Sequence, residues 1–300
     1  MTRTAFIAIV GRPNVGKSTL MNCILGEKVA VVSKKPQTTR TRITGILSKG
    51  EDQYVFLDTP GVHKSRTKLG SYMNKTVNAG IGSADAVILI AEAGRAPGDI
   101  ELALMEKIKK SELPAMLVLN KIDLIRREEL AESIKAYADV MDFEAVVPTS
   151  AMGGKNVDAV LEEAEKFLVE GPWMFDGDII TDQPERQIAS EIIREKILRT
   201  LSEEIPHGTA VMIEAFEDED ELVRVRAEIF CEKESHKGII IGKGGQMLKK
   251  IGSSARPDIE DLLEMQVNLQ LWVKVKKDWR DSDFLLKNFG YNPKDISMNE

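Results

Sequence analysis

Residues 11–18 have the types and spacing of a phosphate-binding loop. They read G-x-x-x-x-G-K-S and follow a short apolar run typical of a buried strand. Glycines in such a loop let backbone N–H groups turn toward phosphate oxygens at the positive end of a helix. The pattern predicts that Lys17 reaches the β- and γ-phosphates of a nucleotide and that the Ser18 hydroxyl binds Mg²⁺. The predicted contacts are Gly11, Arg12, Pro13, Asn14, Val15, Gly16, Lys17, Ser18 and Thr19.

The N-K-x-D string at residues 120–123 predicts which base is bound. A carboxylate at Asp123 can accept hydrogen bonds from N1–H and the exocyclic amine of guanine. Adenine would place its unprotonated N1 there and leave the buried charge unmatched, which is costly. Asn120 and the aliphatic stem of Lys121 are expected to brace the loop and cover the base. Because the string ends a predicted strand of the same sheet, we expect GTP rather than ATP.

A D-T-P-G string at residues 58–61 follows another predicted strand. In this position the Asp58 carboxylate can hold Mg²⁺ through water, and the Gly61 amide can meet the γ-phosphate. Further nucleotide contacts are expected along the string and after the last strand of the sheet, where backbone groups would meet the guanine. They are Thr59, Pro60, Val62, Ser150 and Ala151.

Hydrolysis requires a group that positions water, and the sequence leaves that group open. The polar segment 33–42 contains Thr38 and Thr39, one of which is expected to bind Mg²⁺ when GTP is present. Val62 occupies the place where many GTPases carry a water-orienting glutamine. Valine has no polar group for this task. The alternatives are Arg40, Arg42, bound RNA or a ribosome, and a monovalent cation such as K⁺ held by Asn14.

The first 170 residues alternate strand-like and helix-like patterns, which predicts one α/β domain over residues 1–170. Together with the strings at 11–18, 58–61 and 120–123 it is interpreted as an α/β P-loop GTPase domain. Strands are expected over residues 5–10, 44–48, 54–58, 86–91, 115–120 and 145–148. Apolar residues at three-to-four spacing predict helices over residues 18–25, 69–80, 100–110, 128–140 and 157–168.

Residues 171–184 contain two prolines, two glycines and three aspartates and are interpreted as a linker. A smaller α+β domain is expected over 185–300, with the order α-β-β-α-α-β. Its predicted elements are a helix over 187–201, strands over 210–216 and 222–231, helices over 246–251 and 255–264, and a strand over 266–275.

The second domain contains a candidate RNA-binding turn. Residues 242–245 read G-K-G-G and resemble the G-x-x-G loop of a KH domain, which clamps the backbone of about four nucleotides. The chain carries a net charge of −7, yet residues 237–257 contain five Lys or Arg residues and no Asp or Glu. The predicted RNA-binding residues are Lys237, Ile241, Gly242, Lys243, Gly244, Gly245, Lys249, Lys250 and Arg256.

A GTPase domain joined to a prokaryotic-type KH domain resembles the Era family over nearly the whole chain. The strings that carry the resemblance are Pro36–Arg40, Asp58–Val62, Ala189–Lys196 and Ile241–Gly245. The resemblance implies a ribosome-assembly GTPase that binds the 3′ end of 16S rRNA and the small (30S) ribosomal subunit, with some members peripherally on the inner membrane. It also favours Thr39 over Thr38 as the magnesium ligand. The expected catalytic residues are Lys17, Thr39, Gly61 and Asn14; the expected magnesium ligands are Ser18, Thr39 and Asp58.

Composition and the N-terminal sequence indicate where in the cell the protein is expected to act. No apolar run approaches the roughly 18 residues of a membrane span, and the N-terminus lacks the pattern of a secretory signal, so we expect a cytoplasmic protein. Cys23 and Cys231 suggest neither a metal site nor a disulfide. The three tryptophans are interpreted as core residues, and the three histidines, His63 among them, receive no role.

Two other functions stay open at this point. The second domain of a signalling GTPase would hold a protein or membrane partner instead of RNA. Alternatively, an RNA-binding protein could keep the nucleotide only as a structural cofactor. Ribonuclease-sensitive cofractionation with small subunits tests the first alternative, and steady turnover of GTP tests the second.

Overall fold

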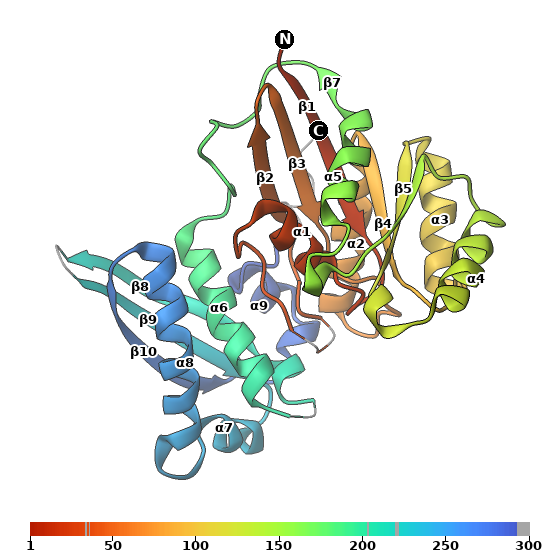
Figure 1. Cartoon of the computed structure of the whole chain (residues 1–300). Helices are drawn as coiled ribbons and strands as arrows, with labels where there is room; N and C mark the ends of the chain where they lie inside the picture. Colours follow the sequence, from red (N-terminus) through yellow and green to blue (C-terminus); the bar gives the residue numbers. More distant parts are fainter. Residues whose placement is uncertain (34, 36, 203, 220–221, 293–300) are drawn as a thin grey trace. The chain divides into compact units, whose positions relative to one another are not determined.

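The computed structural model describes residues 1–292 except 34, 36, 203 and 220–221, so Pro36 of the Era-like string and the last eight residues of the predicted second domain lie outside it. The chain forms two compact units that divide near residue 182 (Figure 1). Each unit is described by itself below. Among the described residues, no helix has both the length and the apolar content needed to cross a membrane.

The first unit is built on a sheet of order β2-β3-β1-β4-β5-β6, with β7 pairing antiparallel to the start of β1. The pairs β1–β3, β1–β4, β4–β5 and β5–β6 are parallel, whereas β2 runs antiparallel to β3. Its strands are β1 (Arg3–Val10), β2 (Ile43–Lys49), β3 (Asp52–Asp58), β4 (Ala86–Glu92), β5 (Ala115–Asn120), β6 (Ala145–Pro148) and β7 (Val169–Glu170).

Helices cover both faces of this sheet (Figure 1). They are α1 (Lys17–Leu25), α2 (Lys68–Gly82), α3 (Asp99–Ser111), α4 (Arg127–Ala138) and α5 (Val157–Ala164). Because successive side chains of a strand point to opposite faces, Ile7 and Ile9 of β1 join one buried cluster while Ala8 and Val10 join the other. A strand buried on both faces therefore reads as a continuous apolar run.

The second unit has a three-stranded sheet of order β10-β9-β8, in which β9 is antiparallel to β8 and parallel to β10. One face is covered by helices whose apolar residues form a single buried cluster with the strands. The elements are α6 (Glu185–Thr200), β8 (Ala210–Glu219), β9 (Leu222–Cys231), α7 (Glu234–Ile241), α8 (Gln246–Leu263), β10 (Gln266–Val275) and α9 (Asp283–Asn288).

The helices of the second unit differ from the prediction in three places, one of which is α9 (Asp283–Asn288), a helix that the prediction omits. The sequence predicts two helices over 246–251 and 255–264, but α8 is one helix that continues through Pro257. Ile251, Ala255 and Ile259 are fully buried on one stripe of it, and this burial outweighs the roughly 3 kcal/mol that an internal proline costs. The short helix α7, which precedes the glycine turn, is absent from the prediction because its Ile239–Ile241 run has no helical period.

Residues 173–181, here called the connecting segment, pack along edge strand β2 and its neighbour β3. Ile46 N–H donates to the Ile180 carbonyl at 2.8 Å, and the Thr181 hydroxyl donates to the Thr44 carbonyl at 2.7 Å. The fully buried Gln53 amide accepts from the backbone N–H of Met174 and Phe175 at 2.8 and 3.1 Å. Most of the predicted linker is thus hydrogen-bonded to the first unit and belongs to it.

Candidate nucleotide site and RNA-binding surface

The phosphate-binding loop lies between the end of β1 and the start of α1, as the sequence predicts. Gly16 has φ +106°, and a Cβ on it would lie 2.2 Å from the Asn120 amide nitrogen. Only glycine fits both that backbone conformation and that close approach. The tight turn brings Asn14, Lys17 and Ser18 to the rim of one pocket.

Lys17 is buried at the floor of this loop. Its ammonium donates to the carbonyl of Arg12 at 3.0 Å and to that of Gly11 at 3.4 Å. Burial lowers the pKa of Lys17 to about 8, and the nearby carboxylate of Asp58 opposes that shift. The charged lysine is therefore held at an energetic cost that an anionic ligand would offset.

Ser18, Thr39 and Asp58 bring three oxygen-bearing side chains together. One Asp58 oxygen, Oδ2, accepts from the Ser18 hydroxyl at 2.6 Å and from the Thr39 hydroxyl at 3.2 Å, and the two hydroxyls are 2.9 Å apart. The other, Oδ1, is buried without a hydrogen-bond partner in the part of the chain that the structure describes. Burial raises the pKa of Asp58, although Lys17 opposes that shift. An all-oxygen cluster with an unpaired buried carboxylate oxygen fits Mg²⁺.

Asn120 joins three parts of the site. Its Nδ2 donates to the Val15 carbonyl of the phosphate loop at 2.7 Å. Its Oδ1 accepts from the Ala151 N–H at 2.9 Å and from the Thr149 hydroxyl at 3.3 Å. Side-chain hydrogen bonds from one buried residue therefore connect the predicted phosphate contacts to the predicted base contacts.

The predicted base contacts lie at the carboxyl ends of β5 and β6. Lys121 adopts φ +67° and begins a single 3₁₀ turn that presents Asp123 to solvent. The Lys121 ammonium lies 3.3 Å from a carboxylate oxygen of Glu92, at the end of β4. Ser150 and Ala151 are buried beside this turn. This arrangement offers one exposed carboxylate and nearby backbone groups to a flat base.

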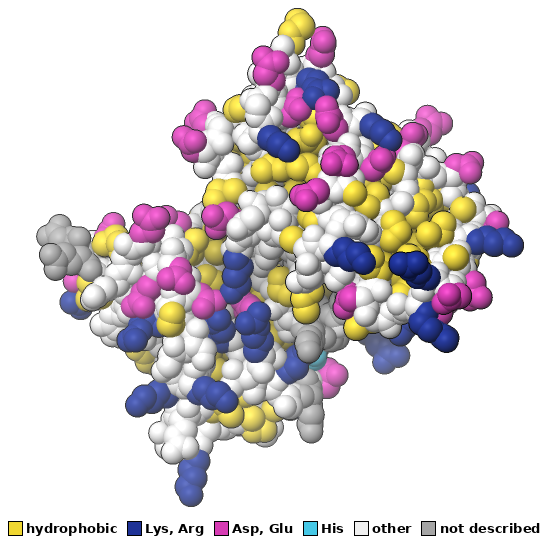
Figure 2. Space-filling model, in the orientation of Figure 1, with side chains coloured by type: hydrophobic (Ala, Val, Ile, Leu, Met, Phe, Trp, Pro, Cys, Tyr) yellow, Lys and Arg dark blue, Asp and Glu magenta, His cyan; other side chains and the backbone are white. Residues whose placement is uncertain are grey.

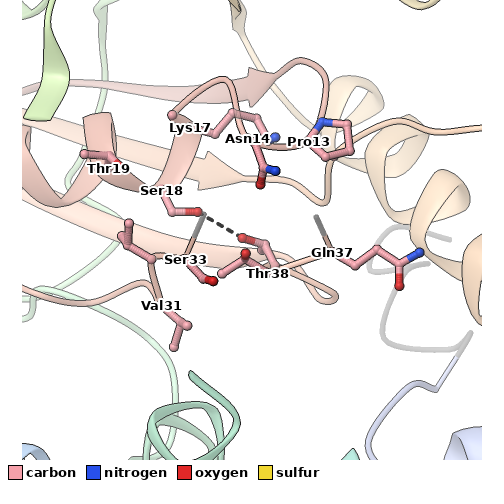
Figure 3. A pocket seen from close by; sticks show the side chains of 13 residues that line it. Pro13, Asn14, Lys17, Ser18, Thr19, Val31, Ser33, Gln37 and Thr38 are labelled. Atoms are coloured by element: carbon pink, nitrogen blue, oxygen red, sulfur yellow. Dashed lines mark hydrogen bonds between the residues drawn. The ribbon is translucent and has the colours of Figure 1, made fainter. Parts of the chain in front are cut away.

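The pocket of the phosphate loop also receives residues from the segment that follows α1. Its lining comprises Pro13, Asn14, Gly16, Lys17, Ser18, Thr19, Val31, Val32, Ser33, Gln37, Thr38, Thr39 and Gly61. In Figure 3, Ser18 and Thr19 lie on one side, while Pro13 and Gln37 lie on the other. Gly61 packs directly on the loop, since a Cβ on it would lie 2.6 Å from the Pro13 nitrogen.

Three predicted nucleotide contacts lie elsewhere. The Arg12 side chain pairs with the buried carboxylate of Glu101 on α3, with Nε and Oε1 3.2 Å apart. Val62 packs against an apolar cluster of the sheet, and the Thr59 hydroxyl donates to the Ile9 carbonyl at 2.8 Å. These side chains brace the site, and the backbone N–H groups of Thr59 and Val62 also donate within the protein, to the carbonyls of Ile9 and Gly11 at 3.3 and 3.2 Å.

Sequence reasoning missed the residue after Val62. The His63 ring nitrogen Nδ1 lies 3.1 Å from the Gly61 carbonyl, and Nε2 lies 3.4 Å from Nε2 of Gln37. Asn74 also donates to the His63 carbonyl at 3.1 Å. A lone histidine gives no local signal of such contacts. Its position two residues after the D-T-P-G string is the feature that could have suggested a role.

The glycine turn of the second unit connects α7 to α8. Gly242, Gly244 and Gly245 all have positive φ, and Lys243 is exposed between them. A Cβ on Gly242 would lie 2.6 Å from that of Met247, so this position requires glycine. A Cβ on Gly244, where φ is +59°, would have none of the described atoms within 4 Å and would face open space.

Beside the turn lies an open groove of about 690 Å³ between α8 and β10. Of the predicted RNA-binding residues, Gly245, Lys249 and Arg256 line it, and Leu248, Leu269 and Leu271 supply apolar surface. Figure 2 shows Lys and Arg side chains over the α7 and α8 part of the second unit. Lys250 is exposed on α8, Lys237 is half-buried on α7, and Ile241 packs in the core rather than in the groove.

Two tryptophans depart from their predicted place in the core, and one of them is the half-buried Trp173. Trp279 is fully buried, and its ring N–H donates to the Gly208 carbonyl at 2.9 Å. Trp173, in the connecting segment, donates to the Glu51 carbonyl at 3.0 Å. Trp272 of β10 is 44% exposed, because it points to the sheet face opposite the helices, so its prediction as a core residue was wrong.

Comparison with known proteins finds one matching family in each of the two units. Residues 6–121 match the family model described as 50S ribosome-binding GTPase, and residues 204–280 match the KH domain. The chain is 48% identical over 290 residues to the GTPase Era of Ruminiclostridium cellulolyticum, covering 96% of this chain and 97% of that protein. It is 51% identical over 294 residues to that of Clostridium novyi, covering 97% and 99%.

Two solved structures share the whole architecture. One is a crystal structure of Era in complex with MgGDPNP and nucleotides 1506–1542 of 16S ribosomal RNA, with a TM-score of 0.94, 36% identity and coverage of 97% of this chain and 100% of that one. The other is a variant of Aquifex aeolicus Era bound to GDP and AlF4⁻, with a TM-score of 0.93, 37% identity and the same coverage. Full-length identity near one half, shared domains and a shared fold establish that the chain belongs to the Era family of GTPases.

Proposed function

We propose that this chain is a nucleotide-switched ribosome-assembly factor, which binds the 3′ end of 16S rRNA and the small ribosomal subunit through its second unit. The observation that carries the proposal is the glycine turn beside an open groove, with Lys249 and Arg256 on the groove wall. Backbone at the turn can approach phosphates closely, and the apolar wall suits unstacked bases. The RNA named for the similar solved structure is the natural first candidate.

The nucleotide occupies the pocket of the phosphate loop in this proposal. Ser18, Thr39 and Asp58 would hold Mg²⁺, which would neutralise charge on the β- and γ-phosphates. Lys17 meets the same phosphates, and the Gly61 N–H meets the γ-phosphate. Asp123 reads guanine at the other end, where Asn120 fixes the two loops relative to each other.

The polar segment 33–42 couples the two functions. It supplies Thr38, Thr39 and Gln37 to the pocket, so the γ-phosphate and Mg²⁺ can order it and hydrolysis can release it. We expect the GTP-bound protein to bind the small subunit more tightly than the GDP-bound protein.

K⁺ is a further element of the proposal. Asn14 lines the phosphate end of the pocket at φ +65°, and Figure 3 shows its side chain directed into the pocket. Its amide oxygen is a suitable ligand for a monovalent cation beside the phosphates. Such a cation would stabilise charge that develops on the γ-phosphate.

The protein is proposed to act in the cytoplasm, with a peripheral fraction at the inner membrane as the family resemblance implies. Flotation of the purified protein with anionic-lipid vesicles, before and after ribonuclease treatment, tests this part separately. Binding that disappears with the RNA would contradict a direct membrane contact.

Crosslinking the protein to RNA in cells and sequencing the bound fragments tests the main proposal. We expect fragments from the 3′ end of 16S rRNA to dominate. Small-subunit affinity should also be higher with a non-hydrolysable GTP analogue than with GDP, at one fixed salt concentration. Equal affinity in the two states would contradict the switch, and crosslinks confined to proteins would favour a signalling GTPase with a protein partner.

A further inference from the structure

The missing water-orienting glutamine has a structural counterpart on another segment. Val62 turns its side chain into the apolar cluster under the phosphate loop, while its N–H donates to the Gly11 carbonyl at 3.2 Å. It cannot contact a water in the pocket through a polar side-chain group. Gln37, from the segment after α1, lines the same pocket on the side of Pro13 (Figure 3), and Gly61 also belongs to that lining.

Pro13 and Gly61 lie next to each other in the lining of the pocket, where the proposed placement puts the γ-phosphate. In the proposed placement of the nucleotide, Ser18, Thr39 and Asp58 would hold Mg²⁺, and this cluster and the Lys17 ammonium would set where the β- and γ-phosphates lie. An attacking water must approach the γ-phosphorus in line with the bond that breaks, from the side beyond Gly61. Gln37 is one of the residues that line the pocket, and its side chain extends outward from the edge of the pocket (Figure 3).

His63 fixes the orientation of that amide. Its Nδ1 lies 3.1 Å from the Gly61 carbonyl oxygen, which can only accept, so Nδ1 carries the proton. In the neutral ring Nε2 is then an acceptor, and the Gln37 Nε2, 3.4 Å away, is the donor. The contact at Nε2 assigns the Gln37 amide nitrogen to His63, and the amide oxygen is the atom of that group that can accept from a water.

We propose that Gln37 orients the hydrolytic water and that His63 is the positioning residue that holds Gln37. The water donates one hydrogen bond to the Gln37 amide oxygen and directs a lone pair at the γ-phosphorus. The new P–O bond forms as the bond to the bridging oxygen breaks, the electron pair goes to the β-phosphate, and the water proton passes to a γ-phosphate oxygen. The products are GDP and phosphate.

This inference rests on the proposed placement of the nucleotide but is independent of the RNA function. Five variants test it: Gln37→Met, His63→Leu, the double variant, His63→Gln, and Lys64→Met as a control on an exposed neighbour of His63. Single-turnover hydrolysis should fall about 10- to 100-fold in Gln37→Met, in the range seen when one oriented polar group is removed from an active site. GTP affinity should change by less than about twofold, because the amide acts on the water and not on the bound nucleotide.

His63→Leu should lose part of the same rate, and the double variant should be no slower than Gln37→Met, because both residues act through one water. His63→Gln, whose amide oxygen can accept from Gln37, should recover part of the rate. Parent-like hydrolysis in Gln37→Met, or losses that multiply in the double variant, would overturn the proposal.

A readout separate from activity is the protonation of the His63 ring, seen by ¹⁵N-resolved NMR of the nucleotide-bound protein. We expect a proton on Nδ1 and a shift of the Nε2 resonance in Gln37→Met. A proton on Nε2 alone would overturn the role of His63. Full GTP affinity in Lys17→Ala would instead contradict the placement of the nucleotide. If Gln37→Met loses GTP affinity but hydrolyses bound GTP at the parent rate, Gln37 is a binding residue only, and the proposal is wrong.

Discussion

The Asn120 amide nitrogen donates to the Val15 carbonyl over 2.7 Å, across 105 residues of sequence. The same side chain accepts from Ala151 and Thr149, so it fixes the base-binding end of the site against the phosphate loop. Asn120→Asp replaces the donor by a carboxylate oxygen that faces another oxygen. We expect GDP affinity to fall by at least about tenfold, consistent with an unpaired buried polar group. Titration with a fluorescent GDP analogue checks this, and unchanged affinity would contradict it.

Asp123 should determine which base the site binds. Asp123→Asn replaces an acceptor carboxylate with an amide, which suits the reversed donor pattern of xanthine, so preference should shift from guanosine to xanthosine nucleotides. Competition between GTP, ATP and XTP for the parent and the variant measures the shift, with the exposed Asp142→Asn as control. Equal affinity of the parent for ATP and GTP would contradict this reading.

Lys17 should destabilise the nucleotide-free protein. Its pKa of about 8 lies below that of a lysine in the unfolded chain, so the unfolded state binds more protons between about pH 8 and pH 10.4. Lys17→Met should therefore be more stable at pH 7, by on the order of 3 kcal/mol, and this advantage should shrink as pH rises through that window. Denaturant unfolding of the first unit from pH 7 to pH 10 measures it.

The exposed Lys75→Met is a matched control for that experiment, and its stability relative to the parent should not vary with pH. The same Lys17→Met protein should bind GTP far more weakly, because it lacks the phosphate-binding charge. A variant less stable than the parent at pH 7 would show that burial of the lysine carries no cost.

Gly244→Asp should abolish RNA binding and leave nucleotide affinity unchanged. The position faces open space, and aspartate tolerates its positive φ better than most residues, so the second unit should still fold. The new carboxylate would meet RNA phosphates at close range. Gly290→Asp adds the same charge at another open glycine with φ +85° and should bind RNA normally. Parent-like RNA affinity of Gly244→Asp at fixed salt would place the RNA site elsewhere.

Asn14 should make hydrolysis depend on potassium. Turnover of the parent should be faster in potassium chloride than in matched sodium chloride, and Asn14→Ala should lose that difference. Asn14 has φ +65°, so Asn14→Gly, which removes the side chain without backbone strain, separates loss of the ligand from distortion of the loop. Equal rates in the two salts, or full potassium stimulation in both variants, would exclude the cation role.

Short motifs allowed much of the nucleotide site to be predicted. The strings at 11–18, 58–61 and 120–123 each follow a parallel strand, and parallel strands end at the same edge of a sheet. Their proximity therefore follows from the predicted topology. The pairing of Arg12 with Glu101 could not be predicted, because the sequence does not say whether a loop side chain turns toward the pocket or the neighbouring helix.

The contact between Gln37 and His63 shows a second limit of prediction from the sequence. The two residues lie 26 positions apart in irregular segments, where neither period nor motif marks a side-chain contact. The continuity of α8 through Pro257 shows a third, because local propensity predicts a break that tertiary burial overrides.

The connecting segment also keeps the first unit from pairing with other copies of itself. Strand β2 forms an end of the sheet, where backbone N–H and C=O groups of an edge strand would otherwise be open to another chain. Ile180 and Thr181 take up the N–H of Ile46 and the carbonyl of Thr44, and Phe175 covers the apolar residues beside them. A chain that ends at Glu170 would expose the backbone groups of this edge and would be prone to associate strand to strand. The solubility of the GTPase unit therefore depends on residues whose composition predicts only a linker between domains.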